Sequence, residues 1–184
     1  MIAPKDCAAI ILAAGRSERF GPYDKLLARF EGRPLIDHIL ASVAEIEFGQ
    51  VVVVVSNEAV AEIAKGHGFE IVRVARGSPQ GASVRAGAAA LGACRAAMMF
   101  LGDMPHVTPD HIVALLAQAE VGGSVASRSG PYLGPPAVVP PALLLGVGPD
   151  EDRGARHLLA EARVVDVAPE VVRDYDVRSD FSGR

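Results

Sequence analysis

Short apolar runs without alternation are the feature that most constrains the fold of this chain. Residues 8–14 and 51–55 are apolar throughout, and residues 95–101 are apolar after the first position. A strand with one face in water alternates apolar and polar side chains, so unbroken runs of this length indicate strands covered on both faces of a parallel sheet. Each run is also far shorter than the about 20 apolar residues that cross a bilayer. The sequence therefore predicts a buried sheet and no association with a membrane.

Helical segments separate the predicted strands. Apolar residues recur at helical spacing over 35–47, and Ser56 and Asn57 are placed to cap a short helix over 58–66. A strand over 70–74 follows. The order strand, helix, strand, helix, strand is that of a doubly wound α/β domain.

The second half continues this alternation with one irregular segment. Thr108 is expected to cap a helix over 108–120, and further strands are expected at 121–127, 137–139 and 163–167. Residues 128–141 are rich in glycine and proline, which predicts a stiff, irregular excursion of the kind found in active-site lids and oligomer contacts. No internal repeat or domain boundary occurs, so we expect one domain over residues 1–184.

Composition excludes several classes of function. Half of the residues are hydrophobic, 22% are charged and the net charge is −4, which argues against disorder and against the broad basic face that general nucleic-acid binding needs. Cys7 and Cys94 lack metal-ligand spacing and are expected as free thiols of a reducing compartment. The N-terminus leads into the first strand without a signal-peptide pattern, so a cytoplasmic location is expected.

The loop after the first strand is glycine-bearing and basic. Gly15 and Gly21 allow backbone N–H groups to approach a ligand, while Arg16, Arg19 and Lys25 gather positive charge in one short segment. Many such loops are plain connections, but three neighbouring cations repel one another unless an anion or solvent screens them. The spacing fits neither the dinucleotide fingerprint nor the Walker loop. A polyphosphate is the ligand that this loop predicts.

Two other segments are candidates for the same site. Asp103 follows the strand at 95–101 and is delivered to the edge of the sheet where ligands of open α/β folds bind, although an aspartate there can also be a plain cap. As a hard oxygen ligand, it suits Mg²⁺. The turn around Gly81 and Ser83 opens a helix, and Ser78 or Ser83 is either its cap or part of a ligand site. His106 and His111 lack a third ligand, so structural or exposed roles are expected for both.

These residues resemble a known family. The pattern Leu12-Ala13-Ala14-Gly15-x-Ser17-x-Arg19-x-Gly21, followed by Lys25-Leu26-Leu27, is similar to the signature of NTP transferases, and within that superfamily to molybdenum cofactor cytidylyltransferases. The segment 101–105 resembles the family's metal-binding motif. The resemblance implies a mostly parallel, three-layer α/β/α sandwich of the nucleotidyltransferase type and the transfer of CMP from CTP to a phosphorylated acceptor.

The resemblance also implies roles for individual residues. Lys25, Arg19 and Asp103 would be catalytic, and Mg²⁺ or Mn²⁺ would be held by Asp103, with Asp176 in the tail as a second ligand. Gly81 and Ser83 would face the base and ribose. The residues implied in nucleotide binding are Leu12, Ala13, Ala14, Gly15, Arg16, Ser17, Arg19, Lys25, Gly81 and Ser83.

Molybdopterin, a phosphorylated pterin, is the acceptor that the resemblance implies, with a molybdoenzyme or its chaperone as a further partner. The segment 81–87 resembles cytidylyltransferases more than the related guanylyltransferases, which favours CTP. Two alternatives remain open. One is the same chemistry with GTP or with a sugar or alcohol phosphate, and the other is a non-catalytic nucleotide- or cofactor-binding chaperone.

Overall fold

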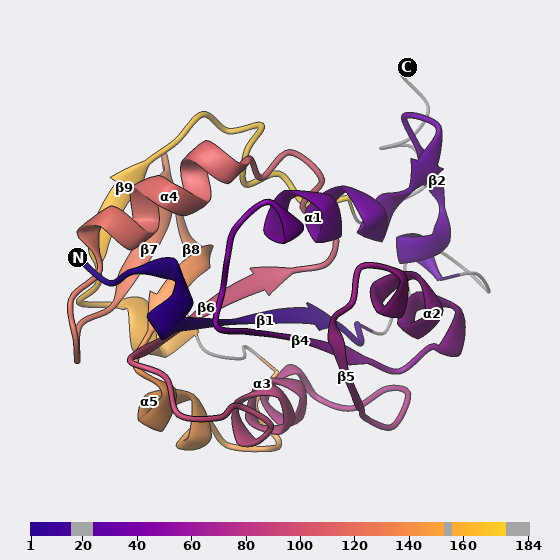
Figure 1. Ribbon diagram of the computed structural model, residues 1–184, viewed down its shortest axis with the longest axis horizontal. Coiled ribbons are helices and arrows are strands. Elements are labelled where there is room, and N and C mark those ends of the chain that lie inside the picture. The colour runs from indigo at the N-terminus through magenta and orange to yellow at the C-terminus, as the bar shows by residue number, and fades with distance from the viewer. Residues whose placement is uncertain (16–23, 153–155, 176–184) are drawn as a thin grey trace.

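The computed structural model describes residues 1–15, 24–152 and 156–175 (Figure 1). Its centre is a seven-stranded sheet in the order β5-β4-β1-β6-β8-β7-β9. The strands are β1 (Cys7–Ala13), β4 (Gln50–Val55), β5 (Glu70–Arg73), β6 (Ala96–Leu101), β7 (Val125–Ser129), β8 (Tyr132–Val139) and β9 (Arg163–Asp166). Neighbouring strands are parallel except that β8 runs antiparallel to both β6 and β7. This arrangement confirms the predicted, mostly parallel α/β sheet.

Helices cover both faces of the sheet (Figure 1). They are α1 (Leu35–Ala44), α2 (Glu58–Gly66), α3 (Gln80–Ala89), α4 (Pro109–Gln118) and the short α5 (Pro141–Leu145). Residues of α1, α2 and α4 pack into one apolar core, and residues of α3 and α5 pack into the other. The result is the three-layer α/β/α sandwich that the resemblance implied.

Strand β1 explains the absence of alternation in the sequence. All seven of its residues are buried. Ala9 and Ile11 belong to the core under α1 and α2, whereas Ile10 and Leu12 belong to the core under α3. Because successive side chains of a strand point to opposite faces, a strand between two helical layers must be apolar at every position.

The prediction of an irregular excursion over residues 128–141 is wrong. The structure has a hairpin here, in which β7 and β8 pair from Val125↔Val138 to Ser129↔Tyr132 around the turn at Gly130 and Pro131. Gly130 has φ +55°, which suits a tight turn. The ladder is interrupted between Ala126 and Ser127, opposite the prolines 135–136, which have no pairing partner there. Prolines are tolerated in a strand at such bulges, because no ladder hydrogen bond needs their missing N–H. The strand predicted at 121–127 begins only at Val125.

The remaining segments are short. They are the 3₁₀ helices η1 (Pro4–Asp6), η3 (Lys25–Leu27) and η4 (Arg156–Leu159), and the two-stranded hairpin of β2 (Arg29–Phe30) and β3 (Arg33–Pro34).

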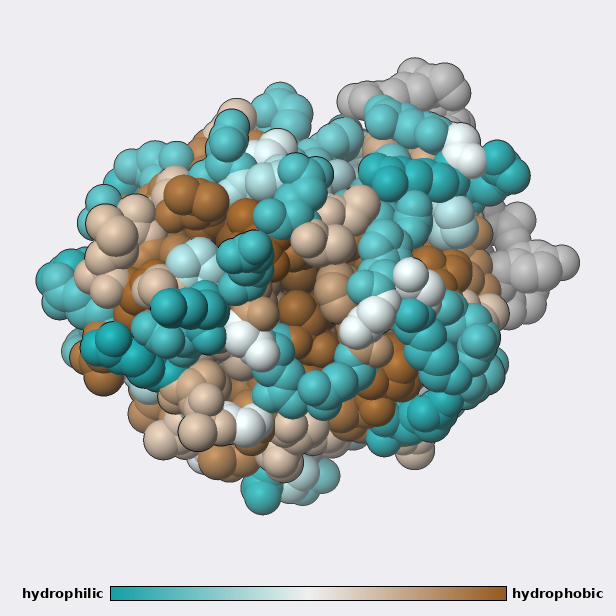
Figure 2. Space-filling view, in the orientation of Figure 1, coloured by the Kyte–Doolittle hydropathy of each residue, from teal (hydrophilic) through white to brown (hydrophobic). Residues whose placement is uncertain are grey.

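In the described ranges, no helix has both the length and the apolar character to cross a bilayer. Apolar residues gather toward the middle of the face drawn in Figure 2, and hydrophilic residues cover the region over α2.

Candidate active site

The candidate site lies at the carboxyl ends of three adjacent parallel strands. β1 pairs with β4 on one side and β6 on the other, with Leu12 opposite both Val54 and Leu101. The segments that follow these strands therefore emerge at one edge of the sheet. This edge of an open α/β sheet is where ligands bind.

Lys25 and Asp103 meet at this edge. Lys25 lies in η3, and its Nζ donates to Asp103 Oδ2 over 2.6 Å, although the residues are 78 positions apart in the chain. Their side chains are only 11% and 15% exposed. A charge-assisted contact of this length between two largely buried groups is strong, because little water screens it. The structure thus brings together the lysine and the aspartate that the sequence singled out.

Asp24 anchors the segment that carries Lys25, and sequence reasoning missed this role. Its Oδ1 accepts from Leu26 N over 3.0 Å and caps η3, while its Oδ2 accepts from Asn57 Nδ2 over 2.9 Å. Asn57 in turn caps α2 by accepting from Ala59 N. The Lys25 segment is therefore tied to the end of β4. The sequence did predict Asn57 as the cap of α2. Nothing in the residues around Asn57 indicated that its side-chain amide would also donate to Asp24.

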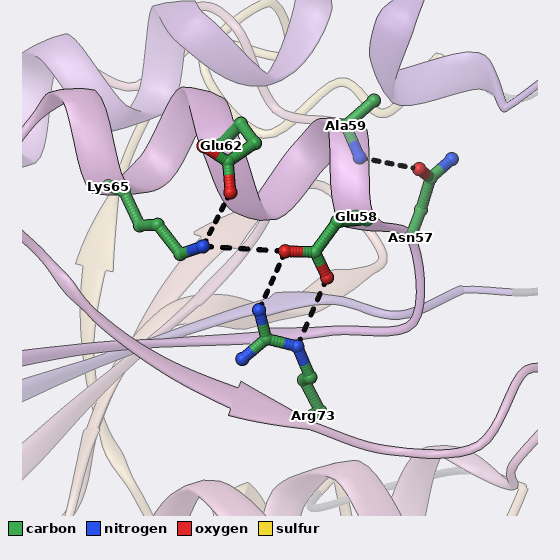
Figure 3. A network of polar contacts seen from close by, with 6 residues as sticks. All are labelled: Asn57, Glu58, Ala59, Glu62, Lys65 and Arg73. Carbon is green, nitrogen blue, oxygen red and sulfur yellow. Dashed lines mark hydrogen bonds and ion pairs between the residues drawn. The ribbon is translucent and has the colours of Figure 1, made fainter.

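Figure 3 shows the polar network that continues from Asn57 along α2. Glu58 pairs with Arg73 of β5 through two hydrogen bonds, and Lys65 bonds to Glu58 and Glu62. The hydrogen bond from Arg73, aided by Lys65, lowers the pKa of Glu58 to about 2. The side chains of Glu58, Glu62, Lys65 and Arg73 are exposed to solvent, so they form a hydrated surface of α2.

Gly102 sets the position of Asp103. Its amide donates to Leu12 O over 2.9 Å, which holds the turn against the end of β1. A Cβ atom at this position would lie 2.8 Å from Ile36 Cδ1 and 3.3 Å from Leu12 O. A methyl group at this position would require the end of the Ile36 side chain to move and would crowd the Leu12 carbonyl, so glycine suits this close approach.

The turn at Gly81 and Ser83 forms the beginning of α3. Pro79 is the N-cap and makes no side-chain cap, and the Ser78 hydroxyl donates to Ala75 O, so a serine cap of this helix is absent. The Gly81 amide donates to Glu151 O over 2.8 Å, and Ser83 is only 4% exposed. The role of both residues in nucleotide binding stays a prediction.

The other predicted nucleotide-binding residues divide into two groups. Leu12, Ala13 and Ala14 are buried at the end of β1 and Gly15 is exposed there. The other three, Arg16, Ser17 and Arg19, lie outside the described residues, as does Asp176, the predicted second metal ligand.

The acidic side chains of the candidate site suit a metal ion that is bound together with the phosphates of a substrate. Among residues 1–15, 24–152 and 156–175, no group of three or more histidine, cysteine, aspartate or glutamate side chains could form a metal cage. Mg²⁺, however, is usually bound by one or two carboxylates together with substrate phosphates. Asp103 at the strand end fits that requirement.

His111 has a structural role. Its Nε2 lies 2.8 Å from Ser127 Oγ, which donates its proton to Pro136 O. Because the hydroxyl proton is used in this way, the imidazole donates from Nε2. Burial lowers the pKa of His111 and so favours the neutral ring.

Comparison with known proteins places this geometry in context. The sequence matches the MobA-like NTP transferase domain over residues 9–167. It is 32% identical over 126 residues to the bifunctional protein GlmU of Alkalilimnicola ehrlichii, covering 61% of this chain and 25% of the relative. It is 30% identical over 125 residues to a 2-C-methyl-D-erythritol 4-phosphate cytidylyltransferase of Dehalococcoides mccartyi, covering 65% and 55%. The chain thus spans about a quarter to a half of the length of these relatives.

Solved structures show the same fold. A homologue of Rv0371c from Mycobacterium sp. strain JC1 superposes with a TM-score of 0.83 at 22% identity, over 97% of this chain and 94% of the other. Rv0371c of Mycobacterium tuberculosis in complex with manganese has a TM-score of 0.79 at 20% identity, over 96% of both chains.

Proposed function

Because the chain belongs to the MobA-like NTP transferase domain family, we propose that it transfers CMP from CTP to a phosphorylated acceptor, with the molybdenum cofactor as that acceptor. The observation that carries the proposal is the Lys25–Asp103 pair at the carboxyl ends of β1 and β6. A buried lysine and a partly buried carboxylate at this edge could supply the two groups that a nucleoside triphosphate and its metal require.

In the proposed reaction, a phosphate oxygen of the acceptor attacks the α-phosphorus of CTP. The bond from that oxygen to the α-phosphorus forms, the bond between the α-phosphorus and the bridging oxygen breaks, and pyrophosphate leaves with the electron pair. Catalysis of this kind rests on positioning and on neutralising charge. The structure offers Lys25 for the charge that develops on the phosphates, and Arg19 is proposed to assist it.

Asp103 is the proposed ligand of Mg²⁺ or Mn²⁺, and Asp176 is proposed as a second ligand. The metal would supply electrostatic stabilisation of the phosphate oxygens. Support for divalent metal use comes from the manganese complex of the structurally similar Rv0371c. The turn that carries Asp103 is held in place by Gly102, whose amide bonds to the end of β1.

The preference for CTP has two supports. Two of the curated relatives are cytidylyltransferases, for 2-C-methyl-D-erythritol 4-phosphate and for 3-deoxy-manno-octulosonate. In addition, Ala14 is only 4% exposed at the end of β1, where a second glycine would leave more space beside a base. We propose that a purine cannot enter without displacing the turn at Gly81 and Ser83.

A nucleotide screen tests the proposal. Pyrophosphate release is measured for CTP, GTP, ATP and UTP with purified molybdenum cofactor as acceptor, and CTP is expected to have the highest kcat/KM. A GTP value equal to or above that for CTP would contradict the cytidylyltransferase assignment.

The acceptor is tested separately with CTP. The names of the relatives favour a second candidate, a sugar- or alcohol-phosphate cytidylyltransferase. Turnover with 2-C-methyl-D-erythritol 4-phosphate in place of the pterin would select it. Tight CTP binding without turnover of any acceptor would instead indicate a nucleotide-binding chaperone.

A further inference from the structure

Tyr175 is a buried aromatic residue at the end of the described chain, next to the candidate site. It is only 2% exposed. Its hydroxyl lies 2.9 Å from His106 Nε2, and its ring meets the ring of Phe30 edge-on at 4.8 Å between centroids. The Arg173 guanidinium lies 5.0 Å above the ring. The Tyr175 side chain therefore joins three segments that lie far apart in the sequence, around residues 30, 106 and 173–175.

Two of these segments carry the candidate catalytic residues. His106 follows Asp103 by three residues in the turn after β6, and Phe30 lies in β2, directly after the η3 segment that holds Lys25. The rings of Phe30 and His106 are 5.5 Å apart. The contact between these rings is therefore a second contact, besides the Lys25–Asp103 ion pair, between the same two segments.

His38 of α1 completes this aromatic cluster, which we define as Phe30, His38, His106 and Tyr175. Its Nε2 is 2.9 Å from the carbonyl oxygen of Phe30, and its ring is 5.2 Å from the Phe30 ring. Phe30 is therefore held on the backbone side by His38 and on the ring side by His106 and Tyr175. A side chain that packs against several elements at once has little freedom to shift.

We propose that the hydrogen bond between Tyr175 and His106 is a positioning contact that holds the Asp103 turn at its working distance from Lys25. The role assigned to this pair of charges rests on the function proposed above. The Tyr175 hydroxyl is buried, so a displacement of His106 would break a hydrogen bond in a place that water does not readily reach, and such a loss costs free energy. The hydrogen bond therefore opposes movement of the turn after β6. An apolar contact depends less on direction and would allow His106 to shift along the ring.

The chain offers a matched pair of variants for testing this. Tyr175→Phe removes the hydroxyl and keeps the ring. Tyr132→Phe removes a hydroxyl that donates to Pro135 O within the β7–β8 hairpin. We expect kcat for nucleotidyl transfer to fall about tenfold in Tyr175→Phe, with KM for CTP within about twofold, and to stay at the wild-type value in Tyr132→Phe.

A double-mutant cycle shows whether the two residues act through one bond. His106→Ala should lose at least as much activity as Tyr175→Phe, because it also removes the ring contact with Phe30, and the double variant should be no worse than His106→Ala alone. His106→Gln retains a donor at a similar reach and should restore much of the rate. Independent losses that multiply in the double variant would contradict a shared positioning contact.

A readout without turnover separates this inference from the proposed function. NMR of protein labelled with ¹³C at aspartate carboxyls follows Asp103 directly, and its resonance is assigned by its loss in Asp103→Asn. We expect that resonance to move in Tyr175→Phe and to stay in place in Tyr132→Phe. An unmoved resonance would overturn the inference even in an active enzyme, whereas a moved resonance in a protein that uses no nucleotide would overturn only the proposed function.

Discussion

Replacing Lys25 by methionine should raise the affinity of the nucleotide-free protein for a divalent cation. In the structure, Lys25 Nζ lies 2.6 Å from Asp103 Oδ2, so a metal ligated by this carboxylate, at about 2.0–2.1 Å for Mg²⁺, would lie close to the ammonium charge. Before nucleotide binds, the ammonium group therefore competes with the metal for the same carboxylate. Methionine keeps an unbranched apolar stem of similar length and removes the charge.

The magnitude follows from the remaining repulsion. If the metal displaces the ammonium group to about 4 Å, two unit charges at that distance interact by about 1 kcal/mol in a fully aqueous dielectric and about 4 kcal/mol near a protein surface. A divalent ion doubles these values. Even the lower figure, about 2 kcal/mol, corresponds to a roughly 30-fold change in Kd at about 1.4 kcal/mol per tenfold.

Electron paramagnetic resonance of free Mn²⁺ measures this affinity without nucleotide. We expect Lys25→Met to bind at least about tenfold more tightly than the wild type, a conservative reading of the Coulomb estimate. Lys65→Met is the control, because Lys65 pairs with Glu58 and Glu62 on the exposed surface of α2, and it should leave the site at Asp103 unchanged. Asp103→Asn should remove the site. Equal Mn²⁺ affinity in the wild type and Lys25→Met, with binding that still requires Asp103, would refute the reasoning.

Two further predictions concern packing and pH. Gly102→Ala places a Cβ atom 2.8 Å from Ile36 Cδ1 and 3.3 Å from Leu12 O, so it should cost about 1–3 kcal/mol of stability; Gly92→Ala, whose nearest contact would be 3.7 Å away, is the control, and equal Tm values for the two variants would show that the turn adjusts. Burial lowers the pKa of His111 in the folded state, so the unfolded chain takes up its proton first and the wild type should lose stability as the pH falls through about 6.5. Urea unfolding of His111→Gln should show a weaker loss between about pH 7.5 and 5.5, and identical pH dependence in both proteins would count against the buried neutral ring.

The β7–β8 hairpin shows where local reasoning failed. Glycine and proline over 128–141 are breakers when each residue is judged by its own backbone preference. In the fold, Gly130 makes the hairpin turn and the prolines 135–136 face the interruption in the ladder. Whether a proline is tolerated in a strand depends on which hydrogen bonds its neighbours offer. These hydrogen bonds depend on the neighbouring strands β6 and β7. The residues next to the prolines in the sequence do not reveal them.

The sequence by itself determined the class of fold and indicated the two charged residues of the candidate site. Unbroken apolarity in β1 and β4 requires cover on both faces, and strand order then delivers Lys25 and Asp103 to one edge of the sheet. Only the tertiary structure decided that these two side chains meet, 78 residues apart, and that Tyr175 bonds to His106 across 69 residues. The physical reason is that periodicity reports which face of an element is buried, whereas side-chain partners across the fold depend on how elements distant in sequence pack together.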